Sequence, residues 1–362
     1  MSVSKKSLRH RGSLLSRRSV LKGTTGLAAA SAAGSFGFPA IAQSKPEQLV
    51  IASGGGALDE AYKAAYFDSF TEKTGIAIIT APYAGLAEVR SMIEADNVDL
   101  DVLNIDAAEA PVAGKNGWLE PIDWSLTDRS KVLPAAAWDD HVYAEVAAKV
   151  MAWNTDSFGD APPQNWVDMW NLEAFPGRRS LWKQAFQTLE VALMGDGVPK
   201  NEIYPIDVDR GLAALDKIKP ELIWWDSGGQ SAQFLIDGES DIGSTWNGRV
   251  FAPKEDGAPV DYTFNDMLFV SGAWCVVKGA KNVHWSMEYI AHTLEPERQA
   301  VYCEHIPYGP VVPDALQFVP AERLPLLPSS EQNIDKGVWS DFIFWADHGE
   351  EVINRFNEWL LS

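Results

Sequence analysis

The chain has 362 residues, with 46% hydrophobic residues and a formal net charge of −20. The length suggests two domains of ordinary size, and the hydrophobic fraction is enough for a sizeable core. So acidic a chain is not expected to bind nucleic acid through phosphates, because that binding needs Lys and Arg surfaces. Beyond the N-terminal region no run of about 20 apolar residues occurs, so nothing in the body is expected to span a membrane.

Residues 1–42 are predicted to be a signal peptide. They hold 7 of the 30 Lys and Arg and none of the 50 Asp and Glu, so the remaining chain has a net charge of −27. Residues 16–22 resemble the twin-arginine export motif, with Val in place of the usual Phe. An apolar stretch at 26–38 precedes an A-x-A cleavage pattern at 40–42. We expect cleavage after about Ala42 and a mature protein in the periplasm.

The body begins with a pattern typical of a βαβ unit. Residues 49–52 predict a strand, 53–56 a glycine-rich loop, 57–73 an amphipathic helix and 76–79 a second strand. Such a unit implies a parallel sheet, with the loop at the carboxyl end of a strand, where open α/β sheets bind ligands. Backbone amides at a helix N-terminus favour anions. The loop is therefore either part of a ligand site or a plain tight turn.

A second unit follows, with a helix at 86–95, a strand at 100–104 and a helix near 109–116. Asp106 lies between the strand and the last helix. It is a candidate pocket residue, and it is equally a candidate N-cap of the helix that follows.

Two long apolar runs, 143–154 and 261–277, predict buried strands that cross between lobes. Lys149 interrupts the first run and Gly272 the second. Lys149 is expected either to extend its ammonium to the surface or to face a cleft. The other expected elements are a loop and short helix at 155–177, strands at 180–182 and 223–225, and helices at 183–194, 209–218, 230–237, 285–294, 296–305 and 339–361.

Residues 241–249 run from a strand-like segment into Trp246, Asn247, Gly248 and Arg249. The indole can supply apolar contact area, and the guanidinium can hold a carboxylate with two hydrogen bonds. The alternative is a surface β-turn with one core Trp and one solvated Arg.

The two cysteines, Cys275 and Cys303, lie in apolar contexts, a strand and a helix. We favour two buried free thiols over a disulfide, although an oxidising periplasm would permit one. No spacing of Cys and His is typical of a zinc site, and no cofactor is expected.

Several short motifs, taken in order, resemble the extracellular solute-binding proteins of ABC importers, in the spermidine/putrescine-binding group. The resemblance covers about residues 47–360, and its motifs lie at 70–76, 100–103, 117–123, 246–248, 279–282 and 306–310. It implies an α/β periplasmic-binding-protein fold of type II, with two lobes joined by two crossing hinge strands near 143–149 and 270–272. Lobe one would be 44–147 plus 271–320, and lobe two 148–270 plus 321–362. It also implies a monomer that delivers a small solute to an inner-membrane permease without catalysis.

Departures from that group bear on the ligand. The acidic pair expected of polyamine binders falls near Gln184 and Gln187, the hinge Asp falls near Gly272, and the neighbouring aromatic falls near Val270. A buried ammonium without a counter-charge costs several kcal/mol, so a diamine needs those carboxylates. Since Arg249 stands three residues after the retained Trp, we expect a small carboxylate-bearing solute, an organic acid or an amino-acid-like compound.

In this interpretation Arg249 holds the carboxylate, the loop at 53–56 binds an oxyanion, Trp246 and Tyr308 form apolar walls, and Asp106 accepts from a hydroxyl or amine. The candidate ligand-binding residues are Ser53, Gly54, Gly55, Asp106, Lys149, Gln184, Trp246, Arg249, Ser271 and Tyr308.

Two alternatives stay open. A polyamine binder of the same fold would need acids from other loops, such as Asp106, Asp226 or Asp341. A periplasmic enzyme is the alternative from another class, but the histidines are scattered and no G-x-S-x-G nucleophile motif occurs.

Overall fold

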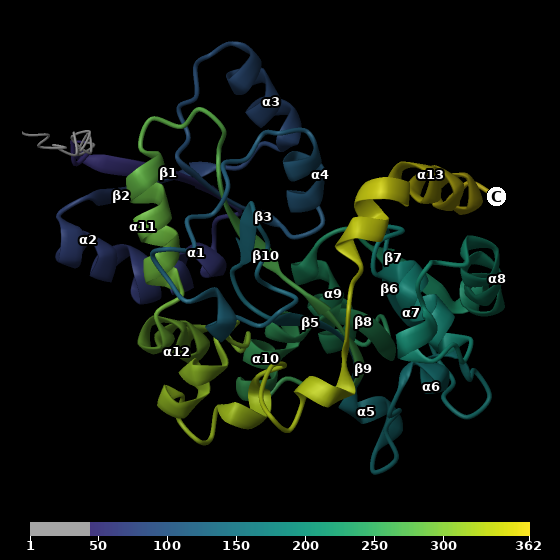
Figure 1. The fold of residues 1–362 in the computed structure, drawn as a ribbon. Coiled ribbons are helices and arrows are strands. Elements are labelled where there is room, and N and C mark those ends of the chain that lie inside the picture. The colour runs from purple at the N-terminus through teal and green to yellow at the C-terminus, as the bar shows by residue number, and fades with distance from the viewer. Residues whose placement is uncertain (1–43) are drawn as a thin grey trace, which may run out of the picture. The chain divides into compact units, whose positions relative to one another are not determined.

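The computed structural model describes residues 44–362 (Figure 1). The signal peptide predicted at 1–42 lies outside the described residues. The strands form a five-stranded sheet in the order β2-β1-β3-β10-β4 and a six-stranded sheet in the order β11-β9-β5-β8-β6-β7. Among the helices over 44–362, none combines the length and apolar character needed to cross a membrane.

The first sheet contains β1 (Gln48–Ser53), β2 (Ala77–Pro82), β3 (Val102–Asp106), β4 (His141–Tyr143) and β10 (Gly272–Val276). β1 pairs in parallel with β2 and β3, which confirms the predicted βαβ unit. The connecting helix is continuous but contains a π-helical turn, so it divides into α1 (Ala57–Tyr62), η1 (Lys63–Phe67) and α2 (Asp68–Thr74). It ends where Gly75 takes a left-handed conformation with φ 72°.

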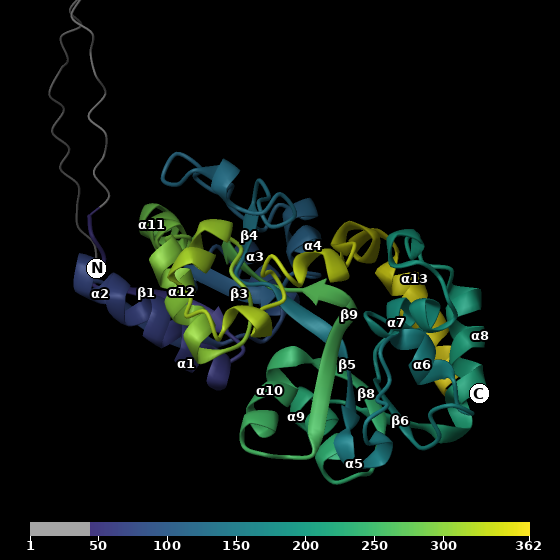
Figure 2. The same ribbon diagram turned by 90° about the horizontal axis from the view of Figure 1, so that it is seen from below.

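The lobe that contains the first sheet has four further helices: α3 (Leu86–Glu94), α4 (Ala110–Lys115), α11 (Val283–Thr293) and α12 (Pro296–His305). α11 and α12 pack beside the α1–α2 helix although more than 200 residues separate them in the chain (Figures 1 and 2). Aromatic rings fill this contact, with Tyr62 and Tyr302 stacked at 5.4 Å between centroids. Such pairs contribute beyond the apolar area they bury, so they fix the two distant segments together.

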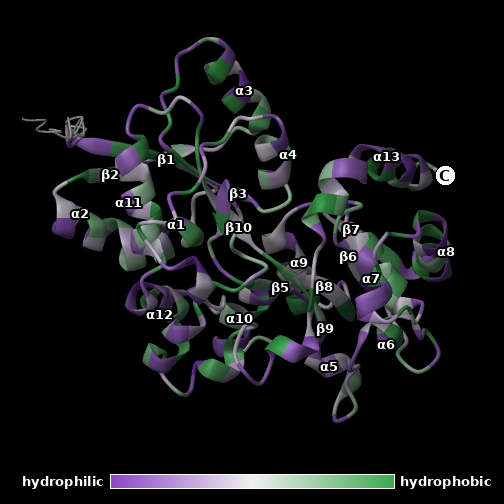
Figure 3. Ribbon diagram, viewed as in Figure 1, coloured by the Kyte–Doolittle hydropathy of each residue, from purple (hydrophilic) through white to green (hydrophobic). Residues whose placement is uncertain are grey.

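The second sheet contains β5 (Ala147–Asn154), β6 (Arg179–Trp182), β7 (Leu222–Trp225), β8 (Ile242–Trp246), β9 (Val260–Val270) and β11 (Val338–Trp339). Its helices are α5 (Thr155–Phe158), α6 (Trp166–Trp170), α7 (Thr188–Gly195), α8 (Val208–Ile218), α9 (Gly228–Ile236), α10 (Asn247–Glu255) and α13 (Phe342–Leu360). Hydrophobic and hydrophilic segments alternate along α8 and α13 (Figure 3), as expected of helices with one face on a core. Short 3₁₀ turns occur at Arg129–Lys131, Lys200–Glu202, Lys219–Glu221, Pro313–Phe318, Leu324–Leu326 and Ile334–Lys336.

The chain passes directly from a strand of one sheet to a strand of the other at 144–146 and at Ser271, and we call these the two crossings; it returns to the second sheet once more between β10 and β11. The long strands predicted at 143–154 and 261–277 are therefore each two strands, β4 with β5 and β9 with β10, because the backbone changes sheets at these points. The two crossings are bonded to each other. Ser271 Oγ donates to the Glu145 carbonyl at 2.5 Å, and the Gly272 amide donates to the Glu145 carboxylate at 2.8 Å.

Three other expectations have clear outcomes. The helix predicted at 183–194 is wrong at its start, because 183–187 form a loop and α7 begins at Thr188. The β-turn alternative for Trp246–Arg249 is also wrong, since β8 ends at Trp246 and α10 begins at once. Cys275 and Cys303 are both buried free thiols, as favoured.

One buried carboxylate joins two helices of the second sheet. Glu190 lies in the first turn of α7, and its Oε1 accepts from Tyr204 Oη and from Trp345 Nε1 of α13, each at 2.7 Å. Burial raises the pKa of Glu190 to about 7, and these hydrogen bonds act in the opposite direction because they favour the charged form.

The raised pKa predicts a pH-dependent stability. Below the unfolded pKa of about 4.5 the contribution of Glu190 is fully present, and it is lost as pH rises through about 7, because the folded state then has to bury the charged form. The advantage of wild type over Glu190→Gln in unfolding free energy should therefore fall by about 2.5 kcal/mol between pH 5 and 8. Urea unfolding measures this. Glu202→Gln, at an exposed position, is the control. If the unfolding free energy of Glu190→Gln changed with pH in parallel with that of wild type, the prediction would be contradicted.

Candidate functional site

A pocket of about 790 Å³ is lined by both sheets and by the two crossings. This volume lies within the range of small-molecule sites. Seven of the ten candidate residues line it, namely Gly54, Gly55, Asp106, Trp246, Arg249, Ser271 and Tyr308. They come from the loop after β1, the end of β3, the junction of β8 with α10, the second crossing and the turn after α12.

Three candidate residues do not line the pocket. Ser53 is buried, and its hydroxyl donates to the Asp59 carboxylate at 2.7 Å. Gln184 is exposed in the loop before α7, whereas Gln187, the other position considered for the acidic pair, does line the pocket. Lys149 is fully buried, so it neither reaches the surface nor faces the pocket. Both expectations for Lys149 were wrong.

Sequence reasoning missed five polar residues of the pocket: Tyr83, Asn104, Glu109, Glu145 and His305. A signal existed for two of them. Glu145 is an acid inside the apolar run that was predicted to cross between lobes, and such a residue is expected to have a partner or a function. Asn104 stands two residues before Asp106 on the same strand, and alternate residues of a strand share a face.

The junction of β8 with α10 holds several segments together. Asn247 is buried, its Oδ1 accepts from the Ala148 amide at 3.0 Å, and its Nδ2 donates to the Pro307 carbonyl at 2.6 Å. A Cβ on Gly248 would lie 2.8 Å from the ring of Tyr308, so only glycine lets that ring pack here. Tyr308 is therefore positioned by residues about 60 positions earlier in the chain.

Arg249 and Trp246 share the space beside the first residue of α9. A Cβ on Gly228 would lie 2.9 Å from Arg249 Nε and 2.9 Å from the Trp246 ring. Trp246 Nε1 donates to the Gln187 side chain at 3.1 Å, which fixes the plane of the indole. Arg249 is exposed and forms no ion pair or hydrogen bond with any residue between 44 and 362. Its guanidinium is thus available to an anion in the pocket.

Three carboxylates, Asp106, Glu109 and Glu145, line the pocket from the first sheet and its crossing, and we name them the acidic wall. Burial raises the pKa of each, and the charge of Asp106 raises the pKa of the other two further. Glu145 accepts from Tyr62 Oη at 2.8 Å as well as from the Gly272 amide, and these bonds favour its charged form. Within the described part of the chain none of the three has an ion-pair partner.

The pocket is therefore polarised. A guanidinium comes from the second sheet, and three carboxylates come from the first, with Asp106 disfavouring the charged forms of the other two. A ligand that places a carboxylate beside the first and an amine beside the second satisfies both walls at once. Over residues 44–362 no group of three or more His, Cys, Asp or Glu side chains could hold a metal ion.

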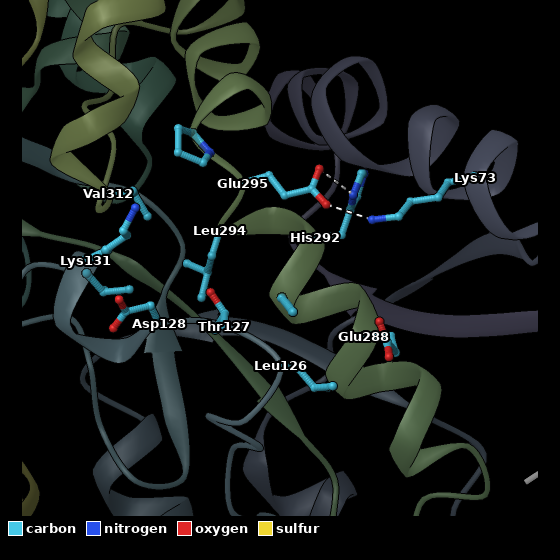
Figure 4. Close-up of a pocket in the computed structure, with 13 residues that line it drawn as sticks. Lys73, Leu126, Thr127, Asp128, Lys131, Glu288, His292, Leu294, Glu295 and Val312 are labelled. Carbon is cyan, nitrogen blue, oxygen red and sulfur yellow. Dashed lines mark hydrogen bonds and ion pairs between the residues drawn. The ribbon is translucent and has the colours of Figure 1, made fainter. Parts of the chain in front are cut away.

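A second pocket of about 220 Å³ lies beside α11 (Figure 4). There Lys73 and His292 both contact Glu295, at 2.8 and 3.1 Å, and His292 Nε2 lies 2.8 Å from Ser69 Oγ. The order Ser, His, Glu is that of a hydrolase triad. However, Ser69 Oγ also lies 3.1 Å and 3.2 Å from the Ala65 and Tyr66 carbonyls of its own helix, and His292 is buried. We therefore assign this cluster to the packing of α2 against α11.

Comparison with known proteins agrees with this geometry. Residues 65–329 match the family of bacterial extracellular solute-binding proteins. The γ-aminobutyric acid-binding protein of Pseudomonas aeruginosa is 35% identical over 329 residues, which cover 89% of this chain and 93% of that protein. The spermidine/putrescine-binding periplasmic protein of Escherichia coli is 23% identical over 252 residues, 67% of this chain and 72% of that protein.

Among solved structures, the Atu4243-GABA receptor matches with a TM-score of 0.81 and 32% identity, over 86% of this chain and 97% of that one. The fold class predicted from sequence and the resemblance to the solute-binding proteins of ABC importers are both confirmed. With a family match over most of its length and a two-sheet fold around one polarised pocket, the chain belongs to the bacterial extracellular solute-binding proteins.

Proposed function

We propose that this chain is the solute-binding component of an ABC importer and captures a small solute that carries both a carboxylate and an amine, as γ-aminobutyric acid does. The observation that carries the proposal is the partnerless Arg249 in the same pocket as the buried Glu145. Two similar proteins whose names include this amino acid support it, a binding protein at 35% identity and a receptor structure at 32%.

In this proposal each part of the pocket has a role. Arg249 holds the ligand carboxylate with two charge-assisted hydrogen bonds, and Glu145 with Asp106 receives the amine. Trp246 and Tyr308 cover the methylene groups between the two ends. The pocket is larger than such a solute, so binding is expected to draw the sheets together about the crossings at 144–146 and Ser271.

A polyamine is the second candidate, because the acidic wall could hold ammonium groups and a polyamine-binding protein is 23% identical. Of the acids first considered for it, only Asp106 lines the pocket. Asp341 caps α13 by accepting from the Phe344 amide, and Asp226 is exposed elsewhere. A partnerless guanidinium in the pocket would repel a diamine, which is why we favour the amino acid.

The remaining expectations form part of the same proposal. The chain is exported through the twin-arginine route, cleaved after about Ala42 and active in the periplasm as a monomer. It hands its solute to an inner-membrane permease and catalyses no reaction on it.

Replacing the guanidinium tests the anion side of the pocket. Arg249→Ala should weaken the binding of γ-aminobutyric acid at least about 30-fold, because a buried carboxylate loses both of its donors. The affinity of Arg249→Lys should lie between those of wild type and Arg249→Ala, since an ammonium cannot form the two parallel hydrogen bonds of a guanidinium. Calorimetry measures both, with the exposed Arg90→Ala of α3 as control. Unchanged affinity in Arg249→Ala, or tight putrescine binding by the wild type, would overturn the proposal.

Replacing the buried carboxylate tests the amine side. Glu145→Gln keeps one oxygen as the acceptor for the Gly272 amide, places an amide group that can donate to the Tyr62 hydroxyl where the second oxygen was, and removes the charge. It should weaken γ-aminobutyric acid about 30-fold and leave butyrate, which has no amine, nearly unchanged. If the affinities for γ-aminobutyric acid and butyrate fell by the same factor, the substitution would instead have distorted the chain at 144–146.

Gly228 gives a test that touches no charged group. Gly228→Ala places a methyl group 2.9 Å from Arg249 Nε and the Trp246 ring, so both must shift and affinity should fall about tenfold. Gly229→Ala is a matched control, because nothing lies within 4 Å of its Cβ. Thermal unfolding should show both variants folded. Equal ligand affinities in the two variants would show that the position of Arg249 does not matter.

A further inference from the structure

Lys149 has an unusual environment for a lysine. It lies in β5 with no exposed surface, and its Nζ has no hydrogen-bond partner in the described part of the chain. Three indole rings surround it, with centroids at 4.3 Å for Trp246, 4.4 Å for Trp225 and 5.0 Å for Trp182. We name these three rings the tryptophan box.

The box is built by aromatic packing. Trp182 and Trp225 stack with centroids 5.7 Å apart and an interplanar angle of 11°. Trp246 meets both edge-on, at 72° and 73°. Rings in this arrangement turn electron-rich faces toward one point, which is the geometry that holds ammonium groups in aromatic cages. Here the protein's own ammonium occupies that point.

Trp246 separates Lys149 from the ligand pocket. The two residues are direct partners in the pairing of β5 with β8. Trp246 lines the pocket and Lys149 does not, so the ammonium lies on the side of the ring away from the ligand. A ligand atom in contact with the other face of Trp246 would be about 8 Å from Nζ, since van der Waals contact adds about 3.5 Å to the 4.3 Å on the lysine side.

The charge of Lys149 is not cancelled by an ion pair within the described residues. Glu190 of α7 is the acid whose charge acts on it, without direct contact. Burial lowers the pKa of Lys149 well below its ordinary value, and the charge of Glu190 opposes that change. The three indole faces also favour the ammonium form. An apolar side chain would fill this space without the desolvation cost, so the choice of lysine needs another explanation.

We propose that Lys149 is a specificity-determining residue that acts through Trp246. Its ammonium makes the second-sheet side of the pocket electropositive together with Arg249, and it keeps the tryptophan box closed to cationic groups of ligands. The carboxylate end of a solute is thereby favoured beside Trp246 and Arg249, and the amine end beside the acidic wall. This inference rests on the proposed function, because it assigns an orientation to the solute proposed above.

The test compares two four-carbon ligands of opposite charge, succinate and putrescine. Lys149→Met keeps most of the side-chain volume and removes the charge, and Lys149→Arg keeps the charge. In Lys149→Met the ratio of putrescine affinity to succinate affinity should rise about tenfold, as expected for a charge about 8 Å away in a partly buried site. In Lys149→Arg the ratio should stay near that of wild type. Weak affinities are measured by displacement of γ-aminobutyric acid in calorimetry.

A merely structural role for Lys149 predicts a different result. If the side chain only supports the Trp246 ring, Lys149→Met weakens both ligands by the same factor, and this outcome overturns the inference. A Lys149→Arg variant that behaves like Lys149→Met overturns it as well. Circular dichroism and thermal unfolding establish that each variant is folded.

Glu190→Gln is a second test of the same inference, and it does not require Lys149→Met to fold. At pH 8 it removes a negative charge that acts on Lys149, so the ratio should shift toward succinate, opposite to the effect of Lys149→Met. A shift toward putrescine contradicts the inference. The proposed function fails separately, in wild type, if γ-aminobutyric acid does not bind or if Arg249→Ala leaves its affinity unchanged. Preferential binding of putrescine by the wild type overturns both.

Discussion

The two hydrogen bonds of the Asn247 side chain are the constraint on which the binding pocket depends. One bond goes to Ala148 of the first strand after a crossing, and the other to Pro307 of the turn that carries Tyr308. Because Asn247 opens α10 directly after β8, these bonds connect three segments that are distant in the chain. Trp246, Gly248 and Arg249 are placed by the same short stretch of backbone, and the Gln187 side chain then fixes the plane of the indole.

Opposite charge on the two walls distinguishes this pocket from a general polar cleft. In the acidic wall, the charge of Asp106 raises the pKa of both Glu109 and Glu145, because a neighbouring negative charge disfavours their ionised forms. Arg249 lacks a carboxylate partner among the residues of known position. Charged groups left unpaired in a concave site are costly to stability, and the free energy is recovered when a ligand supplies the missing partners. A solute with a carboxylate and an amine supplies both.

On the second-sheet side of the pocket, Trp246 packs against the buried Lys149, so a second cationic side chain lies beneath the residues that line the pocket. The high tryptophan content of the chain, 15 residues, is concentrated in part around Lys149, where three indoles replace the water that an ammonium normally requires. Glu190, whose charge acts on Lys149, is bound by Tyr204 and by Trp345 of the C-terminal helix α13.

The sequence by itself determined the local elements and the family. Apolar periodicity and glycine positions were enough for the βαβ unit, and the order of short motifs was enough for the two-lobed fold, because both depend on residues close together in the chain. It also predicted Trp246 and Arg249 as ligand-binding candidates, since the Trp is retained from the polyamine binders and the guanidinium three residues later departs from them.

Only the tertiary structure decided which polar residues share the pocket. Glu145 and Gly272 are 127 positions apart and meet because both lie at crossings, which no local pattern encodes. Lys149 interrupted an apolar strand in the way a cleft residue would, yet its face of β5 is covered by Trp182 and Trp225 from two other strands. The side to which a strand residue points follows from alternation, but what covers that side depends on the order of strands in the sheet.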